Sequence, residues 1–128
     1  MKANYTFLLI EDNAIDQLVT KQLLCKTLGI DNINIVDNGK EALQWITNNV
    51  ENLDNSLVIL LDINMPVMNG FQFLKEYEAL PEGVKKQTLI FMLSSTLSNE
   101  DLDKIKKSSC VKTLLNKPLS IQKLLQFI

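Results

Sequence analysis

Five strand-like segments recur along the chain, at positions 6–10, 33–36, 57–61, 88–93 and 112–115. The third, Leu57-Val58-Ile59-Leu60-Leu61, contains no polar residue, and a short apolar run of this kind is typical of a strand that is buried on both faces. Strands buried in this way belong to parallel sheets that helices cover on both sides. The second segment is shorter and includes Asn34, which indicates a strand at the edge of the sheet.

The stretches between these segments have the pattern of helices. Apolar residues recur at helical spacing within 13–28, 43–50, 71–80 and 120–128. The more charged stretch 98–107 opens with Ser98, a residue type that favours a helix start. Strand and helix therefore alternate five times, which predicts an α/β domain built on one parallel sheet. The sequence contains no linker, internal repeat or low-complexity segment, so we expect a single domain.

Composition narrows the possible roles of the chain. Apolar residues make up 46% of the 128 residues and the net charge is −2, so the chain can form a core and has no overall positive charge to attract nucleic acid. No apolar run reaches the roughly 20 residues that span a membrane. The N-terminus also lacks the form of a signal peptide, so we expect a cytoplasmic protein. Cys25 and Cys110 have no metal-binding spacing and are expected to be reduced thiols.

Polar side chains follow the strand-like segments at the points where these end. Glu11 and Asp12 follow the first, Asp62 the third, Ser94 the fourth and Lys117 the fifth. The carboxyl ends of parallel strands meet at one edge of a sheet, so we expect these side chains to lie close together. Because the chain has no histidine, Ser-His-Asp and Cys-His catalysis and histidine-ligated zinc are excluded. Its chemistry must rest on carboxylates, hydroxyls and lysine.

Three carboxylates at one edge repel one another, by about 4 kcal/mol per pair at a separation of about 4 Å and an effective dielectric constant near 20. A cation or the protonation of one carboxylate relieves this repulsion, and carboxylates with retained waters suit Mg²⁺. Lys117 adds a further positive charge and Ser94 a hydroxyl. Together these groups surround a space that suits a phosphoryl group, beside which Asp62 could attack phosphorus as a nucleophile.

Four motifs of the chain resemble those of response-regulator receiver domains, the modules of two-component signal transduction that accept phosphoryl groups. They are Leu9-Ile10-Glu11-Asp12-Asn13, Leu61-Asp62-Ile63-Asn64-Met65-Pro66-Val67-Met68-Asn69-Gly70, Met92-Leu93-Ser94-Ser95 and Asn116-Lys117-Pro118-Leu119. Each alone is weak, but all four occur in order at the ends of predicted strands. The resemblance implies a flavodoxin-like (βα)5 fold, a doubly wound parallel sheet with strand order 2-1-3-4-5. It also implies a single, stand-alone receiver domain over residues 1–128, with no output domain in this chain.

The resemblance implies a role for each residue that would meet the phosphoryl group. Asp62 resembles the phosphoacceptor, which becomes an aspartyl phosphate. Ser94 resembles the switch hydroxyl that moves to a phosphoryl oxygen, and Lys117 resembles the lysine that pairs with phosphate. The peptide bond between Lys117 and Pro118 is expected to be cis, as it is in the family.

The resemblance also implies that the chain binds Mg²⁺. The implied ligands are Glu11, Asp12, Asp62 and the backbone carbonyl of Asn64. Glu11 stands where aspartate is frequent in the family, and its extra methylene favours contact with the metal through a water molecule. We therefore expect direct coordination mainly by Asp12 and Asp62.

Four further positions are expected to tune or transmit the signal. Asn64 and Thr96 each lie two residues past a site residue and resemble positions that set phosphoryl lifetime. Both are polar and modest in size, so we expect water to reach the phosphoryl group and its lifetime to be ordinary. Ser95 belongs to the same loop as Ser94. Leu114 occupies the position of the family's aromatic switch, and because leucine has no ring to swing, we expect the loop after Ser94 and the fourth helix to carry the signal.

The leading hypothesis is a phosphorelay module that takes a phosphoryl group onto Asp62 from a histidine kinase or a phosphotransfer protein, and then changes its affinity for an unknown downstream protein. By resemblance, the donor docks on the loop at Pro118 and at the start of the first helix, near Asn13, Ala14, Asp16 and Gln17. We expect no enzyme activity beyond the module's own phosphorylation and dephosphorylation. We also expect no direct nucleic-acid or membrane partner, and a monomer or a phosphorylation-dependent homodimer.

Three other functions compete with this hypothesis. A non-phosphorylated adaptor with the same fold is compatible with Leu114, although the complete set of acids, hydroxyl and lysine argues against it. An aspartyl-phosphate hydrolase needs a second aspartate two residues after the nucleophile, where this chain has Asn64. A flavin-binding module needs a phosphate loop rich in glycine and hydroxyls after the first strand, where the acids of Glu11-Asp12-Asn13 would repel phosphate.

Overall fold

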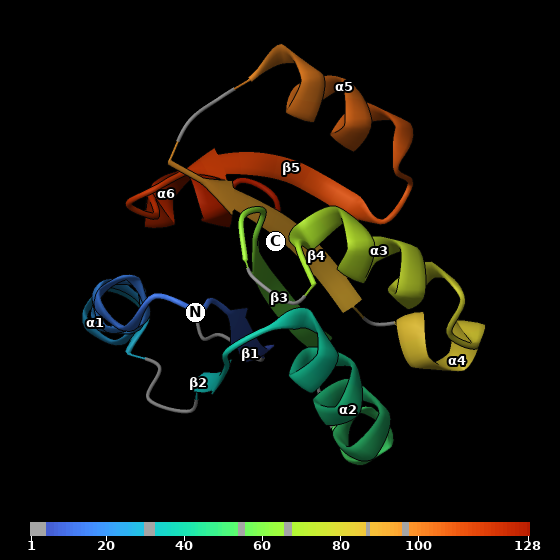
Figure 1. Cartoon of the computed structure of the whole chain (residues 1–128). Coiled ribbons are helices and arrows are strands. Elements are labelled where there is room, and N and C mark those ends of the chain that lie inside the picture. The colour runs from blue at the N-terminus through green and yellow to red at the C-terminus, as the bar shows by residue number, and fades with distance from the viewer. Residues whose placement is uncertain (1–4, 30–32, 54–55, 66–67, 87, 96–97) are drawn as a thin grey trace.

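The centre of the molecule is a parallel sheet of five strands in the order β2-β1-β3-β4-β5 (Figure 1). The computed structural model describes residues 5–29, 33–53, 56–65, 68–86, 88–95 and 98–128. The strands are β1 (Tyr5–Ile10), β2 (Ile33–Val36), β3 (Ser56–Asp62), β4 (Thr88–Ser94) and β5 (Val111–Asn116). The predicted fold class and strand order are therefore confirmed.

Six α-helices occur within the described residues, one more than the sequence pattern predicts. They are α1 (Ala14–Leu28), α2 (Gly39–Asn49), α3 (Gly70–Glu78), α4 (Glu82–Lys85), α5 (Asn99–Lys107) and α6 (Ile121–Leu125), and a 3₁₀ turn, η1 (Val50–Asn52), follows α2. The additional helix is α4, which begins after Pro81, where the sequence pattern predicts that a helix ends. Proline is well tolerated at a helix start because its fixed φ suits the first turn.

The last helix is shorter than the predicted stretch 120–128. Its α-helical part ends at Leu125, and the next two backbone N–H groups donate to carbonyls three residues earlier, from Gln126 to Lys123 and from Phe127 to Leu124. Such three-residue bonds tighten the end of a helix into a 3₁₀ turn.

Two apolar cores lie on opposite faces of the sheet, because successive side chains of a strand point to opposite sides. On one face, Leu8 and Ile59 belong to a core that also includes residues of α2, α3 and α5. On the other face, Phe7 and Leu60 pack with residues of α1 and α6. Figure 1 shows the sheet between these layers, with α1 on its left and α2 on its right. This double burial is why β1, β3 and β4 are apolar in almost every position.

Most of the longer helices begin with a side chain that caps the first turn. Asn13, Asn38, Asn69 and Ser98 each accept a hydrogen bond from the backbone N–H three residues later, at the starts of α1, α2, α3 and α5. Such caps satisfy N–H groups that a helix start would leave without partners. After β1 and β2 the capping residue follows the strand closely, so α1 begins four residues after Ile10 and α2 three residues after Val36.

Cys25 and Cys110 are free thiols, which confirms the expectation from their spacing. In the part of the chain that the structure describes, no helix has both the length and the apolar character that crossing a membrane requires.

Candidate functional site

Three acids converge at the carboxyl edge of the sheet. Glu11 and Asp12 directly follow β1, and Asp62 is the last residue of β3. Carboxylate oxygens of these residues all lie within 4.8 Å of one another. Glu11 and Asp62 are buried, with 1% and 4% of their surfaces exposed, whereas Asp12 is exposed. The cluster therefore has two acids shielded from water and one that faces it.

Lys117 enters this cluster from the end of β5. Its Nζ lies 2.7 Å from Glu11 Oε1, 3.1 Å from Asp16 Oδ2 and 3.3 Å from Asp62 Oδ1. Its backbone N–H donates to the carbonyl of Ser94 at 2.9 Å, which ties the loop after β5 to the end of β4. The peptide bond from Lys117 to Pro118 is cis, the isomer that the sequence resemblance implies.

Burial and charge shift the pKa values of two of these groups. Burial raises the pKa of Glu11 to about 7, and the neighbouring Asp62 carboxylate adds to this rise, while the contact with Lys117 opposes it. Burial alone would lower the pKa of Lys117, but its ion pairs with Glu11 and Asp16, together with the charge of Asp62, outweigh burial and raise it. Lys117 is therefore a permanent cation at neutral pH, and Glu11 is an acid poised between its two protonation states.

The raised pKa of Glu11 predicts a pH dependence of stability in metal-free buffer. Between its usual value of 4.5 and about 7, the folded protein holds a proton that the unfolded chain has released, so this group makes stability fall as pH rises through that window. From about pH 5 to about pH 7 the fall should be about 2 kcal/mol. Urea unfolding at both pH values, with EDTA, should show it in the wild-type protein relative to Glu11→Gln. Identical pH slopes for the two proteins would contradict the prediction.

The backbone holds Asp62 closely. The N–H of Asn64 donates to Asp62 Oδ1 at 3.3 Å, and the N–H of Gly70 donates to the carbonyl of Ile63 at 2.8 Å. A Cβ atom at position 70 would lie only 2.9 Å from the carbonyl oxygen of Asp62. The first residue of α3 must therefore be a glycine for the helix to start so close to the phosphoacceptor candidate.

The other predicted residues lie at different depths around this edge. Ser94 ends β4 and is completely buried, while Ser95 next to it and the Asn64 side chain are exposed. Leu114 lies in β5, is partly buried and packs against the core beneath α3 and α5. Thr96 falls outside the described residues. The edge thus brings together the acids, Ser94 and Lys117, whereas Leu114 lies within the sheet.

Two site residues in α1 were not assigned these positions from the sequence, which suggested them only as donor-docking residues. Asp16 pairs with Lys117, and the Gln17 side-chain amide donates both to the Glu11 carbonyl at 2.6 Å and to Asp37 Oδ1 at 3.0 Å. Asp16 lies in the first turn of α1, which begins at the carboxyl edge of the sheet, and this position is a signal that it lies near the site. No comparable signal exists for Gln17, because Asp37 follows a different strand.

The set of donors fits a hard divalent cation. Glu11, Asp12 and Asp62 offer carboxylate oxygens, which Mg²⁺ prefers, and exposed Asp12 leaves room for the waters that this ion retains. One ammonium group faces four acids when Asp16 is included, so the ionised cluster keeps a net negative charge. Burial is the main cause of the raised pKa of Glu11, and among the acids the charge of Asp62 adds to it.

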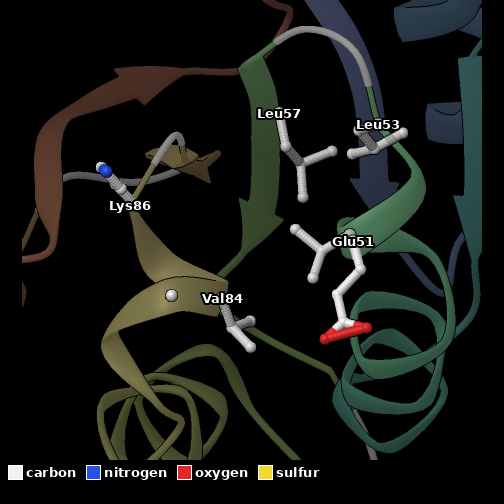
Figure 2. A pocket seen from close by; sticks show the side chains of 7 residues that line it. Glu51, Leu53, Leu57, Val84 and Lys86 are labelled. Carbon is white, nitrogen blue, oxygen red and sulfur yellow. The ribbon is translucent and has the colours of Figure 1, made fainter.

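Two hollows help to define where ligands could approach. One, of about 360 Å³, adjoins the acid cluster and is lined by Asp16, Val19, Thr20, Ser95, Lys117 and Pro118. Another, of about 230 Å³, lies between η1 and α4 beside Leu57, at the opposite end of β3 from Asp62, where Figure 2 shows Leu53, Leu57 and Val84 around it. Only the first is in a position to take part in chemistry at Asp62.

Comparisons with known proteins agree with this geometry. The family model of the response regulator receiver domain matches residues 7–128. The chain is 31% identical over 127 residues to "Two-component response regulator 24" of Arabidopsis thaliana, a match that covers 99% of this chain and 84% of that protein. The crystal structure of a response regulator receiver protein from Dyadobacter fermentans is 29% identical with a TM-score of 0.87, covering 95% of this chain and 93% of the other.

A third relative was solved with a metal ion. The structure of the Mn²⁺-bound form of response regulator Rcp1 is 25% identical with a TM-score of 0.70, and the match covers 94% of this chain and 86% of that one. Other curated relatives are longer, and this chain spans 7% to 29% of their lengths. The family match extends over nearly the whole sequence and includes every residue of the acid and lysine cluster. The chain belongs to the response regulator receiver domains of two-component systems.

Proposed function

We propose that Asp62 accepts a phosphoryl group from a histidine kinase or a phosphotransfer protein in a Mg²⁺-dependent step, and that the resulting aspartyl phosphate changes the affinity of the chain for a downstream protein. One observation carries this proposal: the buried Asp62 carboxylate ends β3 within 4.8 Å of two other carboxylates and 3.3 Å from the Lys117 ammonium. The same arrangement supports a signalling module that promotes only its own phosphorylation and dephosphorylation.

The chain's own residues would perform the transfer mainly by positioning and by charge. An Asp62 carboxylate oxygen forms a bond to phosphorus while the bond from phosphorus to the donor breaks, and the donor leaves with that electron pair. The Lys117 ammonium, already 3.3 Å from Asp62, pairs with a phosphoryl oxygen, and the Ser94 hydroxyl donates a hydrogen bond to another. These contacts stabilise negative charge where the transferred group carries it.

Mg²⁺ would neutralise the acids and the phosphoryl oxygens when bound. Asp12, Asp62 and the Asn64 carbonyl would hold it directly, and Glu11 would contact it through water, because both Glu11 oxygens already have partners in Lys117 Nζ and the Asn13 N–H. The Mn²⁺-bound form of the relative Rcp1 supports a divalent cation in this family.

Labelling with a small phosphodonor tests the proposal directly. Incubation with acetyl phosphate and Mg²⁺ should add the mass of one phosphoryl group to the intact protein. EDTA should prevent the addition, and Asp62→Asn should abolish it. Asp37→Asn is the matched control, because it removes the same charge from the same sheet edge and keeps an oxygen for the Gln17 bond; it should label like the wild-type protein.

A failure to label would contradict the proposal. If the wild-type protein gains no mass at saturating Mg²⁺ and also fails to bind beryllofluoride, an analogue of the phosphoryl group, Asp62 is not a phosphoacceptor. The chain would then function as a non-phosphorylated adaptor. If mass is gained but Asp62→Asn still gains it, the acceptor is another residue.

A further inference from the structure

Asp16 is held toward Lys117 by the start of α1. Its Oδ2 lies 3.1 Å from Lys117 Nζ and accepts a hydrogen bond from it. Its own backbone N–H donates to Asn13 Oδ1, the side chain that caps the helix. Asn13 directly follows Glu11 and Asp12, so its cap fixes the first turn of α1, and with it Asp16, beside these two acids.

The three carboxylates around Lys117 differ in how much water can reach them. The side chains of Glu11 and Asp62 are 1% and 6% exposed, whereas that of Asp16 is 40% exposed. An ammonium group has three N–H donors, so a phosphoryl oxygen that pairs with Lys117 must displace one of these partners. Losing the lysine would leave Glu11 or Asp62 buried as an unpaired charge, while water can take over the bonds of Asp16 at low cost.

Asp16 also differs from the other two in its place at the site. The acids close enough to share a metal ion are Glu11, Asp12 and Asp62, and Asp16 is not among them. Its contact with the site is made through the lysine, and both residues line the hollow of about 360 Å³ beside Asp62. A change at Asp16 should therefore alter the lysine without removing a metal ligand.

We propose that Asp16 is a positioning residue that holds Lys117 in the unphosphorylated protein and yields it to the phosphoryl group, so that it competes with phosphoryl binding. This inference rests on the proposed phosphoacceptor function of Asp62. Removing the carboxylate should favour the phosphoryl-bound state by roughly two- to fivefold, the range expected for a partly exposed ion pair.

Beryllofluoride titration in Mg²⁺, followed by amide NMR signals, measures this competition. Asp16→Asn should reach its midpoint at a roughly two- to fivefold lower beryllofluoride concentration than the wild-type protein. Asp16→Glu restores the carboxylate and should stay close to the wild-type midpoint. Asp37→Asn removes a charge from the same edge but does not contact Lys117, so it should also stay close and thereby exclude a general charge effect.

A metal-free measurement reports on the lysine itself. In EDTA, an amine-reactive ester acylates accessible lysines, and peptide mass spectrometry compares Lys117 with exposed Lys112 in the same protein. The acylation of Lys117 relative to Lys112 should increase by roughly two- to fivefold in Asp16→Asn. Asp16→Glu and Asp37→Asn should show the wild-type ratio. Lys112 is exposed in the folded protein, so it corrects the Lys117 signal for reagent concentration and reaction time.

The two proposals fail in different ways. If the wild-type protein binds no beryllofluoride, the function of Asp62 is wrong and the role of Asp16 falls with it. If the wild-type protein binds it but Asp16→Asn and Asp37→Asn share the wild-type midpoint, only the role of Asp16 is overturned. An unchanged Lys117 acylation ratio in Asp16→Asn overturns it as well, because the ion pair then does not hold the lysine.

Discussion

Replacing Lys117 by methionine is expected to lower the free energy of unfolding by about 3 to 5 kcal/mol at about pH 8 in EDTA. The ammonium lies within 3.3 Å of carboxylate oxygens of Glu11 and Asp62, whose side chains are only 1% and 6% exposed. Without it, two buried acids of like charge face each other with no counter-charge, and an uncompensated buried charge is costly. Urea unfolding of the two proteins measures the difference.

The same substitution should make stability depend more steeply on pH. The contact with Lys117 lowers the pKa of Glu11 against the effect of burial, so its loss raises that pKa further. Near pH 5 the folded variant then retains a proton on Glu11, the repulsion is relieved and the loss of stability is smaller. The proton is released, and the full loss appears, only as pH rises through this higher pKa, which lies above the wild-type value of about 7. Mg²⁺ should restore more stability to the variant than to the wild-type protein, because the metal supplies the missing positive charge.

Phosphoryl transfer to the variant should fall by about 100-fold or more, as expected when a donor that stabilises developing charge is removed. The matched control is Lys112→Met, a change of the same size at an exposed position of the same strand. It should alter stability by no more than about 0.5 kcal/mol and leave labelling unchanged. If Lys117→Met is as stable as the wild-type protein in EDTA at about pH 8, the ion pairs of Lys117 do not contribute to folding.

The sequence predicts that the site residues lie together because the parallel topology of the sheet places them at the same edge. Once β1, β3 and β5 are parallel, the residues that follow them must meet at one edge whatever their separation in sequence. Glu11, Asp62 and Lys117 are brought together in this way across more than half of the chain. Periodicity is a reliable signal here because the strands are buried on both faces and therefore apolar throughout.

The partners of Lys117 were harder to predict. The contact between Asp16 and Lys117 depends on the direction in which the Asp16 side chain leaves the first turn of α1. That direction is set by the Asn13 cap and by the lysine itself. The sequence pattern places Asp16 on the correct helix but gives no reason to choose the lysine over water. The short helix α4 was missed for a related reason, since a single turn of four residues carries no periodicity.

The ends of β4 and β5 are connected in a way that bears on Leu114. The Lys117 N–H bonds the Ser94 carbonyl, so the hydroxyl and the lysine proposed to contact phosphate belong to one hydrogen-bonded pair of loops. Leu114 packs in the core two residues before the end of β5. A movement of Ser94 toward a phosphoryl group can therefore be transmitted through the backbone, which does not require an aromatic ring at position 114.

Replacing Gly70 by alanine is expected to destabilise the protein by about 2 to 3 kcal/mol and to slow phosphoryl transfer by about 100-fold. A Cβ atom at this position would lie 2.9 Å from the Asp62 carbonyl oxygen, 2.9 Å from Met92 Cε and 3.0 Å from Ile63 Cα. Met92 can move its terminal methyl, but the other two contacts are backbone atoms at the end of β3. The added methyl group must therefore push either α3 or Asp62 itself away from its position.

A second glycine provides the control for this prediction. Gly83 in α4 has no atom within 4 Å of an added Cβ, so Gly83→Ala should be neutral or stabilising by up to about 1 kcal/mol, as expected when alanine replaces glycine in a helix. Urea unfolding and acetyl phosphate labelling of both variants separate the causes. Loss of stability with normal labelling in Gly70→Ala would mean that α3 moves and Asp62 stays. Loss of both stability and labelling would mean that the strain falls on Asp62. The carbonyl that meets the new methyl group belongs to this residue, which would attack phosphorus.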